Sequence, residues 1–208
     1  MAFATNVFIN CPFDKEYDPL LKSLIFVLVY LGFTPKISQT RSSSNIRINQ
    51  IIAHIRDSKF GIHDLSRSKP MAVGELPRFN MPYELGLDIG CLEFGSGKLK
   101  TKKILILETS RFHYQKVLSD IAGQDISEHN DDPKKLVTRV RNWFASVENK
   151  NYPGSTEIWL AYNRFRSYLN EYLGRKKYTM EDIDEIPIDE FLGFSKRWLG
   201  SHKTENTF

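Results

Sequence analysis

Short apolar segments alternate with segments of helical character through the first half of the chain. The apolar segments span residues 6–10, 34–38, 59–63 and 103–107. Strands that alternate with helices predict β–α–β units and a parallel sheet with helices on its faces. We therefore expect an α/β fold in which residues 6–10, 59–63 and 103–107 form adjacent, parallel, central strands.

Helical patterns continue beyond the last of these strands, where the strand signal stops. Apolar spacing and cap residues predict helices over residues 17–31, 45–56, 84–92, 132–147 and 155–173. Residues 180–199 are expected to form one or two short helices, with Pro187 as a break. We expect an α/β domain over residues 1–128, a helical region over 129–200 and a disordered tail over 201–208. The aromatic face of the helix that carries Trp159 is expected to be core or an oligomer interface. Residues 119–126 either close over a ligand crevice or cap neighbouring helices, and both interpretations stay open.

Composition narrows the class of protein. The 208 residues are 41% hydrophobic and 26% charged, as in an ordinary soluble globular protein. The 29 basic and 25 acidic residues nearly balance, and the resulting net charge of +4 is too small to indicate nucleic-acid binding. Cys11 and Cys91 form no metal or disulfide pattern, which favours a reducing compartment. The longest apolar run, 24–31, is far shorter than the roughly 20 residues that span a bilayer. We expect a cytoplasmic protein without a membrane segment.

Polar residues stand where the predicted strands end. Asn10 and Asp64 close two strands, and Glu84 opens a helix after a loop. Ligands of parallel α/β sheets bind at the carboxyl ends of the strands. We expect the three side chains to line one cleft within reach of one ribose-sized ligand, with Glu84 facing solvent in that cleft. A carboxylate there could stabilise or attack an oxocarbenium-like centre, although the helix dipole also favours acidic residues in a first turn.

Several other site types lack their signatures. The chain has neither a phosphate-binding Walker loop nor a G-x-G-x-x-G sequence after its first strand. Its histidines are scattered, so no metal site is predicted. We expect a reaction that needs no cofactor.

Three segments together carry a family resemblance. Asn10-Cys11-Pro12-Phe13, Asp64-Leu65-Ser66 and Pro82-Tyr83-Glu84-Leu85-Gly86 resemble the nucleoside 2-deoxyribosyltransferase family and its TIR-like relatives, over about residues 6–108. The resemblance implies a flavodoxin-like fold and cleavage of an N-glycosidic bond. It implies that Glu84 is the nucleophile or cation stabiliser. The substrate-binding residues that we expect on this basis are Asn10, Phe13, Tyr17, Asp64, Arg78 and Asn80.

One position departs from the family pattern. Arg78 stands six residues before Glu84, where the transferases carry an Asp. An arginine suits a phosphate-bearing substrate, such as a nucleotide or NAD, and Arg41 and Arg47 are further candidates to face an anion. The chain also resembles an uncharacterised bacterial branch of the TIR-like proteins through Asn80–Gly86 and a later segment, Ser119–Ile126.

These observations lead to two functional hypotheses. The first is an N-glycoside hydrolase that acts on a nucleotide or NAD as a homo-oligomer, in the manner of a bacterial defence or toxin-like effector. The alternative is a nucleotide-sensing or scaffolding module that binds without turnover.

Overall fold

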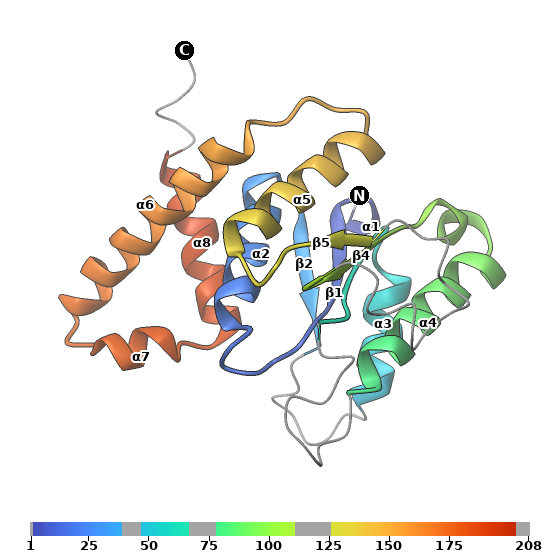
Figure 1. Ribbon diagram of the computed structural model, residues 1–208, viewed down its shortest axis with the longest axis horizontal. Helices are drawn as coiled ribbons and strands as arrows, with labels where there is room; N and C mark the ends of the chain where they lie inside the picture. The colour runs from blue at the N-terminus through green and yellow to red at the C-terminus, as the bar shows by residue number, and fades with distance from the viewer. Residues whose placement is uncertain (1, 39–46, 67–77, 111–125, 203–208) are drawn as a thin grey trace.

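A five-stranded parallel sheet forms the centre of the protein. The computed structural model describes residues 2–38, 47–66, 78–110 and 126–202. Its strand order is β2-β1-β3-β4-β5, and every neighbouring pair is parallel (Figure 1). This is the order of flavodoxin-like folds, so the predicted fold class and the central position of three strands are confirmed. The strands are β1 (Asn6–Asn10), β2 (Thr34–Ile37), β3 (Phe60–Asp64), β4 (Lys103–Glu108) and β5 (Ile126–Glu128).

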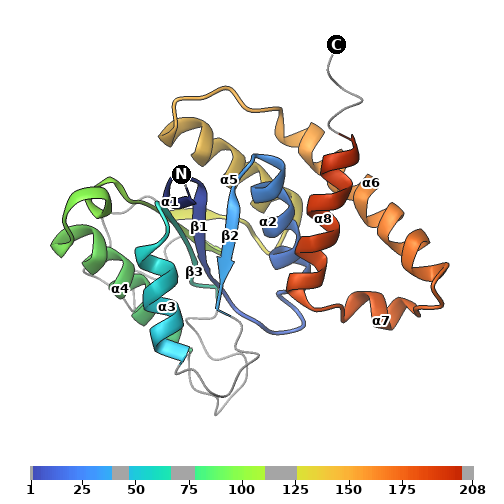
Figure 2. The same cartoon turned by 180° about the vertical axis from the view of Figure 1, so that it is seen from behind.

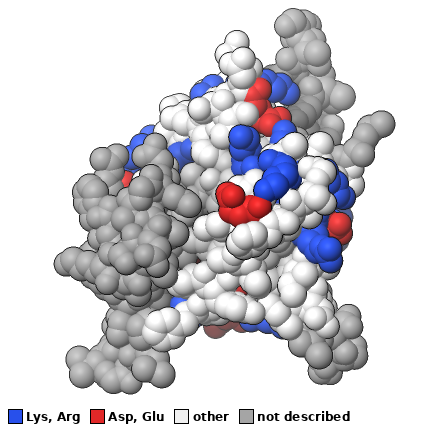
Figure 3. Space-filling view, turned by 90° about the vertical axis from the view of Figure 1, so that its right-hand side faces the viewer, with Lys and Arg blue, Asp and Glu red and all other residues white. Residues whose placement is uncertain are grey.

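Helices cover both faces of the sheet, with a further group outside them. They are α1 (Ala2–Thr5), α2 (Asp18–Tyr30), α3 (Arg47–Arg56), α4 (Asn80–Phe94), the 3-10 helix η1 (Gly97–Thr101), α5 (Pro133–Val147), α6 (Ser155–Gly174), α7 (Met180–Asp184) and α8 (Ile188–His202). Helices α3 and α4 lie on one face, and α2 and α5 on the other (Figures 1 and 2). Helices α6 and α8 pack on the outer side of α2. Figure 3 views the molecule from the side that carries α4.

Helix α2 is buried between two layers, which explains its nearly continuous apolar sequence. Phe26 contacts the sheet-side core and also stacks on Phe165 of α6, with ring centroids 5.3 Å apart. The aromatic face of α6 is therefore core. Lys22 is only 2% exposed, because it forms an ion pair with Asp18 at 2.7 Å and donates to the carbonyl of Asp184 at 2.6 Å. This lysine ties the C-terminal helices to α2.

Helix α4 begins earlier than the sequence suggests. The sequence predicts a start at Glu84, but the helix begins at Asn80 and accommodates Pro82 in its first turn, where a proline needs no hydrogen-bond partner. Glu84 is thus in the second turn. The first-turn dipole effect, which would explain an acidic residue without any function, falls off over that distance.

Three of the expectations fall on residues outside the described ranges. Residues 119–125 and 203–208 lie outside the described residues, as does Arg41. The short edge strand β5 was not predicted; its three half-exposed residues become a strand only by pairing with β4. Among the described helices, none combines the length and the apolar character that a membrane crossing requires.

Candidate functional site

A buried hydrogen-bonded chain ties α4 to the sheet beneath it. Asn10 Nδ2 donates to the carbonyl of Met81 at 2.8 Å and to His63 Nδ1 at 3.0 Å. Because the amide nitrogen can only donate, Nδ1 of His63 accepts. The proton of the ring is therefore on Nε2, which lies 3.0 Å from Asp88 Oδ2. The end of β1 and the first turn of α4 are held together by this arrangement.

Asp88 completes the chain with a buried ion pair. Its Oδ1 lies 3.0 Å from Lys102 Nζ, which also donates to the carbonyls of Ile55 and Ser58 at 2.8 and 2.5 Å. We call Asn10, His63, Asp88 and Lys102 the Asp88 network; none is more than 3% exposed. A charge pair at this depth needs close pairing and hydrogen bonds to offset its lost hydration. Within the described residues, Oδ1 of Asp88 has the ion pair but accepts no hydrogen bond. The network sets where α4, and hence Glu84, sits on the sheet.

A second buried group surrounds Asp64 on the other face of the sheet. The hydroxyl of Tyr17 donates to Asp64 Oδ2 at 2.5 Å, and His129 Nε2 lies 2.9 Å from the same oxygen. The backbone N–H and the hydroxyl of Ser66 both donate to Oδ1. Nδ1 of His129 accepts from the backbone N–H of Asp131 at 3.1 Å, so its Nε2 carries the proton that points at Asp64. We call Tyr17, Asp64, Ser66 and His129 the Asp64 network.

Electrostatics within this network favour the charged form of Asp64. Complete burial acts to raise its pKa, but the hydrogen bonds from His129, Ser66 and Tyr17 outweigh that effect. The pKa of Asp64 is therefore lowered from its ordinary value. Sequence reasoning missed His129, whose place beside Asp64 depends on the β5–α5 connection returning to the end of β3.

The expectation that Asn10 and Asp64 converge on one ligand needs correction. Asn10 lies opposite His63 in the β1–β3 register, so the two side chains share a face, and Asp64 is the next residue along β3. Successive side chains of a strand point to opposite faces. Asn10 therefore points towards α4, and Asp64 towards α2 and α5. The amide nitrogen of Asn10 and both carboxylate oxygens of Asp64 bond to groups inside the fold. A role for either side chain in binding sugar stays a prediction.

Glu84 differs from these two residues in its surroundings. Its side chain is 5% exposed, so the sequence-based picture of a solvent-facing carboxylate is wrong. Among the described residues, none donates a hydrogen bond to it. Burial raises the pKa of Glu84, and the positive charge of Arg47 partly opposes that rise. It is a nearly buried carboxylate near the positive charge of Arg47, which comes from the neighbouring helix α3.

Cys11 shows that three carboxyl groups approach one point at this edge of the sheet. The pKa of this buried thiol is raised well above its ordinary value by burial and then by the negative charges of Asp64, Glu84 and Asp14. Such charge effects act over short distances inside a protein. Glu84, Asp64 and Asp14 therefore all lie within electrostatic range of Cys11, the residue that follows β1.

Two arginines border the site beside the turn that follows β1. The guanidinium of Arg47 lies 6.0 Å from the ring centre of Phe13, and Arg78 forms an ion pair with Asp14 at 3.4 Å. Phe13 is 38% exposed, and Arg78 is 45% exposed at its side chain. An accessible aromatic ring with a cationic group near it can stack a base and hold a phosphate. Asn80 is exposed at the start of α4.

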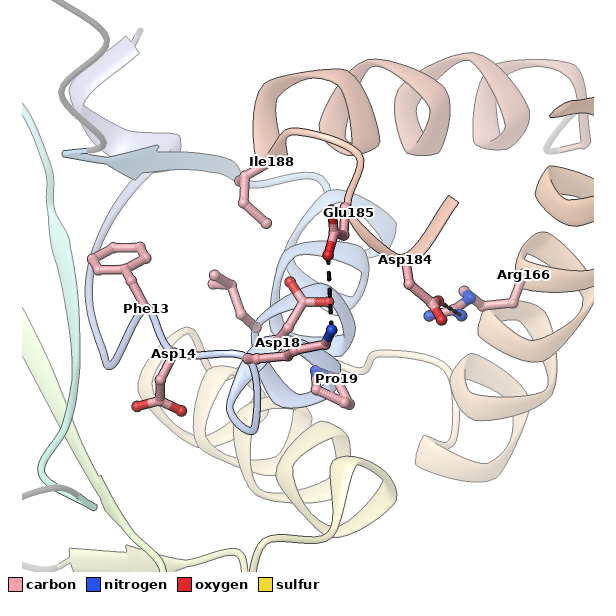
Figure 4. Close-up of a pocket in the computed structure, with 10 residues that line it drawn as sticks. Phe13, Asp14, Asp18, Pro19, Arg166, Asp184, Glu185 and Ile188 are labelled. Carbon is pink, nitrogen blue, oxygen red and sulfur yellow. Dashed lines mark hydrogen bonds and ion pairs between the residues drawn. The ribbon is translucent and has the colours of Figure 1, made fainter. Parts of the chain in front are cut away.

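The same turn also lines a cavity that the sequence did not predict. This space of about 550 Å³ lies between the β1–α2 turn and the C-terminal helices, and Figure 4 shows Phe13, Asp18 and Ile188 around it. An ion pair between Arg166 and Asp184, 3.4 Å apart, stands at one side. Phe13 and Asp14 thus contact both the arginines and this cavity.

No group of three or more His, Cys, Asp or Glu side chains within the described ranges is placed to hold a metal ion. Comparison of the sequence with models of known families, with curated proteins and with solved structures finds no match. A functional conclusion therefore rests on the strand order of the sheet and on the residues at its carboxyl edge.

Proposed function

We propose that this protein is an N-glycoside hydrolase that cleaves the base–ribose bond of a nucleotide or of NAD, with Glu84 as the catalytic residue. The observation that carries the proposal is the state of the Glu84 carboxylate. It is nearly buried at the ligand-binding edge of a flavodoxin-like sheet, and no described residue hydrogen-bonds to it. Burial raises the pKa of this carboxyl group, with Arg47 partly opposing the rise, and ionisable groups perturbed in this way concentrate at functional sites.

The chemistry needs one negative charge at the sugar. As the base departs with the electron pair of the C–N bond, positive charge builds on the anomeric carbon and the ring oxygen. A fixed carboxylate in a low-dielectric site stabilises that charge far more than water does. Water then forms the new C–O bond, and its proton passes to the released base or to solvent. Glu84 serves as cation stabiliser in this scheme, or captures the sugar first as a nucleophile.

The substrate class is inferred from the surroundings of Glu84. Arg47 and Arg78 supply positive charge beside the exposed ring of Phe13. Arginine pairs with phosphate oxygens through two parallel hydrogen bonds, and an aromatic ring stacks on a base. A phosphate-bearing nucleotide uses both features, whereas a free nucleoside uses only the ring.

The direct test is base release. Purified protein is incubated with NAD, with nucleotides and with deoxynucleosides, and free base is measured by chromatography. Glu84→Gln keeps the side-chain shape but removes the charge, so base release should fall by a factor on the order of one hundred or more. Glu181→Gln, on exposed α7, is the matched control and should keep the wild-type rate. A Glu84→Gln protein with the wild-type rate contradicts the proposal.

A specific observation also favours a second function, nucleotide sensing without turnover. The amide nitrogen of Asn10 and both carboxylate oxygens of Asp64 already bond to groups inside the fold, which leaves few of their atoms for a ribose. Isothermal titration calorimetry separates the two proposals. Nucleotide binding by the wild-type protein without base release from any substrate would support the sensing function.

A further inference from the structure

An apolar groove runs between α3 and α4, on the side of the molecule shown in Figure 3. Its volume is about 290 Å³, and its walls include Ile52 of α3, Leu87 and Cys91 of α4, and Leu99 of η1. Arg56 stands at its border. None of these residues belongs to the site proposed around Glu84. The groove is open to solvent, although most of its lining is hydrocarbon.

A projecting aromatic side chain stands next to this groove. Phe94 ends α4 with 92% of its surface exposed, more than any other large hydrophobic residue described. Tyr83, Leu87, Cys91 and Phe94 follow one another at spacings of four, four and three, so they form one stripe along the helix. Exposure of a phenylalanine to water costs about 1.5–3 kcal/mol relative to burial. Such a stripe is typical of a surface that is covered in the working state of a protein.

We propose that the groove and Phe94 form a two-fold interface between two copies of this chain, with Phe94 of each copy inserted in the groove of the other. A two-fold interface uses the same patch on both partners, so a projection and a matching hollow must lie side by side on one surface. Cys91 and Gly95 line the hollow and flank the projection in sequence, so this condition is met within one helical turn.

The charged residues around the groove and Phe94 are also consistent with a two-fold pairing of this surface. Arg56 borders the hollow, and Glu93 precedes the projecting Phe94. Within the described part of the chain neither side chain has an ion-pair partner. Inserting Phe94 in the opposite groove brings Glu93 of one copy towards Arg56 of the other, twice by symmetry. The charges thus favour a second copy of this chain over an unrelated apolar partner. The inference does not depend on the proposed enzymatic activity.

The first test is the association state of the full-length chain. Sedimentation equilibrium over a wide concentration range should show a monomer–dimer equilibrium. Phe94→Ala should weaken the dimer at least tenfold. At concentrations where the wild type is monomeric, the two proteins should melt at the same temperature, because the side chain is 92% exposed in one copy. Met180→Ala removes another exposed hydrophobic side chain, 60% exposed on α7, and should leave association unchanged. A wild-type chain that stays monomeric, or a Phe94→Ala dimer of wild-type strength, overturns the proposal.

Charge reversal tests the register of the two copies. Arg56→Glu and Glu93→Arg should each weaken the dimer, since each places like charges opposite one another. The double variant exchanges the two charges and should restore association. If the single variants associate as the wild type does, or the double variant fails to recover, the proposed pairing of Arg56 with Glu93 is wrong.

Thiol labelling provides a third, independent test. Cys11 is 2% exposed, so in the folded protein a maleimide should react at the partly exposed Cys91. Because Cys91 lines the groove that Phe94 of the other copy fills, dimer formation covers this thiol. A maleimide should therefore label Cys91 more slowly where the dimer forms than in the monomer. Equal labelling rates in monomer and dimer overturn this interface.

Discussion

Gly61 faces the carboxylate of Asp88 so closely that a Cβ atom on residue 61 would lie 2.1 Å from Oδ2. The same Cβ would lie 3.0 Å from Nε2 of His63. Asp88 has little freedom to retreat, because His63 and Lys102 hold its two oxygens. We expect Gly61→Ala to force the Asp88 network apart and to lower the free energy of unfolding by about 1–3 kcal/mol. Urea denaturation measures the change.

Gly86→Ala is the matched control for this substitution. No atom lies within 4 Å of a Cβ added there, and the residue is exposed within α4. Alanine is the better helix former, so this variant should gain roughly 0.5–1 kcal/mol. If Gly61→Ala is as stable as the wild type, the Asp88 network is looser than its geometry indicates.

The Asp64 network should stabilise the protein in a pH-dependent manner. The folded pKa of Asp64 is lowered below its ordinary value of 3.8, so the folded state favours the ionised form. Its contribution is therefore present above pH 3.8 and is lost as pH falls through the lowered pKa. Asp64→Asn should cost roughly 1.5–3 kcal/mol at neutral pH. Melting temperatures measured from pH 7 to pH 3 should show this deficit shrinking only in the acidic part of the range.

Glu84 should have the opposite effect on stability. Burial raises its folded pKa above the ordinary 4.5, so the folded state binds the proton more tightly than the unfolded chain does. The stability of the wild-type protein therefore falls as pH rises from 4.5 through the raised pKa. Glu84→Gln avoids that loss, so it should melt at a higher temperature than wild type at neutral pH and at the same temperature below pH 4.5. Equal melting temperatures at neutral pH would argue against a carboxylate that is destabilised by burial.

The activity of the proposed enzyme should follow the same titration. Cation stabilisation requires ionised Glu84, so base release should decline as pH falls through the raised pKa, which lies above 4.5. A pH–rate profile with NAD measures this acidic limb. A rate that stays constant to below pH 4.5 would indicate that another group carries the charge.

Arg78 should affect binding rather than chemistry. Its guanidinium is 45% exposed and contacts Asp14 at 3.4 Å, so its removal should change stability little. Arg78→Ala should raise KM for phosphate-bearing substrates about tenfold, the size of one charge-assisted hydrogen bond, and spare unphosphorylated nucleosides. An equal rise in KM for both substrate types would contradict phosphate recognition by this residue.

The C-terminal helices should be needed for folding of the sheet domain. One hydrophobic core includes strand residues, α2, α5, α6 and α8. Removing residues 151–208 exposes Phe26, which stacks on Phe165, and removes the hydrogen bond between Lys22 and the carbonyl of Asp184. We expect this fragment to lose cooperative thermal unfolding, measured by circular dichroism, whereas a chain ending at His202 should unfold like the full-length protein. A stable fragment would support a separate domain over residues 1–128, which for now stays a prediction.

The sequence by itself determined the sheet and its central strands. Val7 and Ile9, like Ile62, are apolar at strand spacing and bounded by turn residues, so local pattern alone placed them. The strand order then follows from short connections and the handedness of β–α–β units. The sequence also identified Glu84 as a candidate catalytic residue, through the family resemblance of three segments.

Only the tertiary structure decided which way the side chains at that edge point. Whether Asn10 and Asp64 share a face depends on the register between β1 and β3, and no residue within either strand encodes the register of the pair. Two partners of Asp64 are Tyr17 and His129, and His129 lies 65 residues later in the chain. These side chains reach Asp64 only because of how α2 and α5 pack on the sheet. Sequence patterns record local periodicity, whereas the burial of Glu84 and the two networks beside it arise from contacts between segments that are distant in the chain.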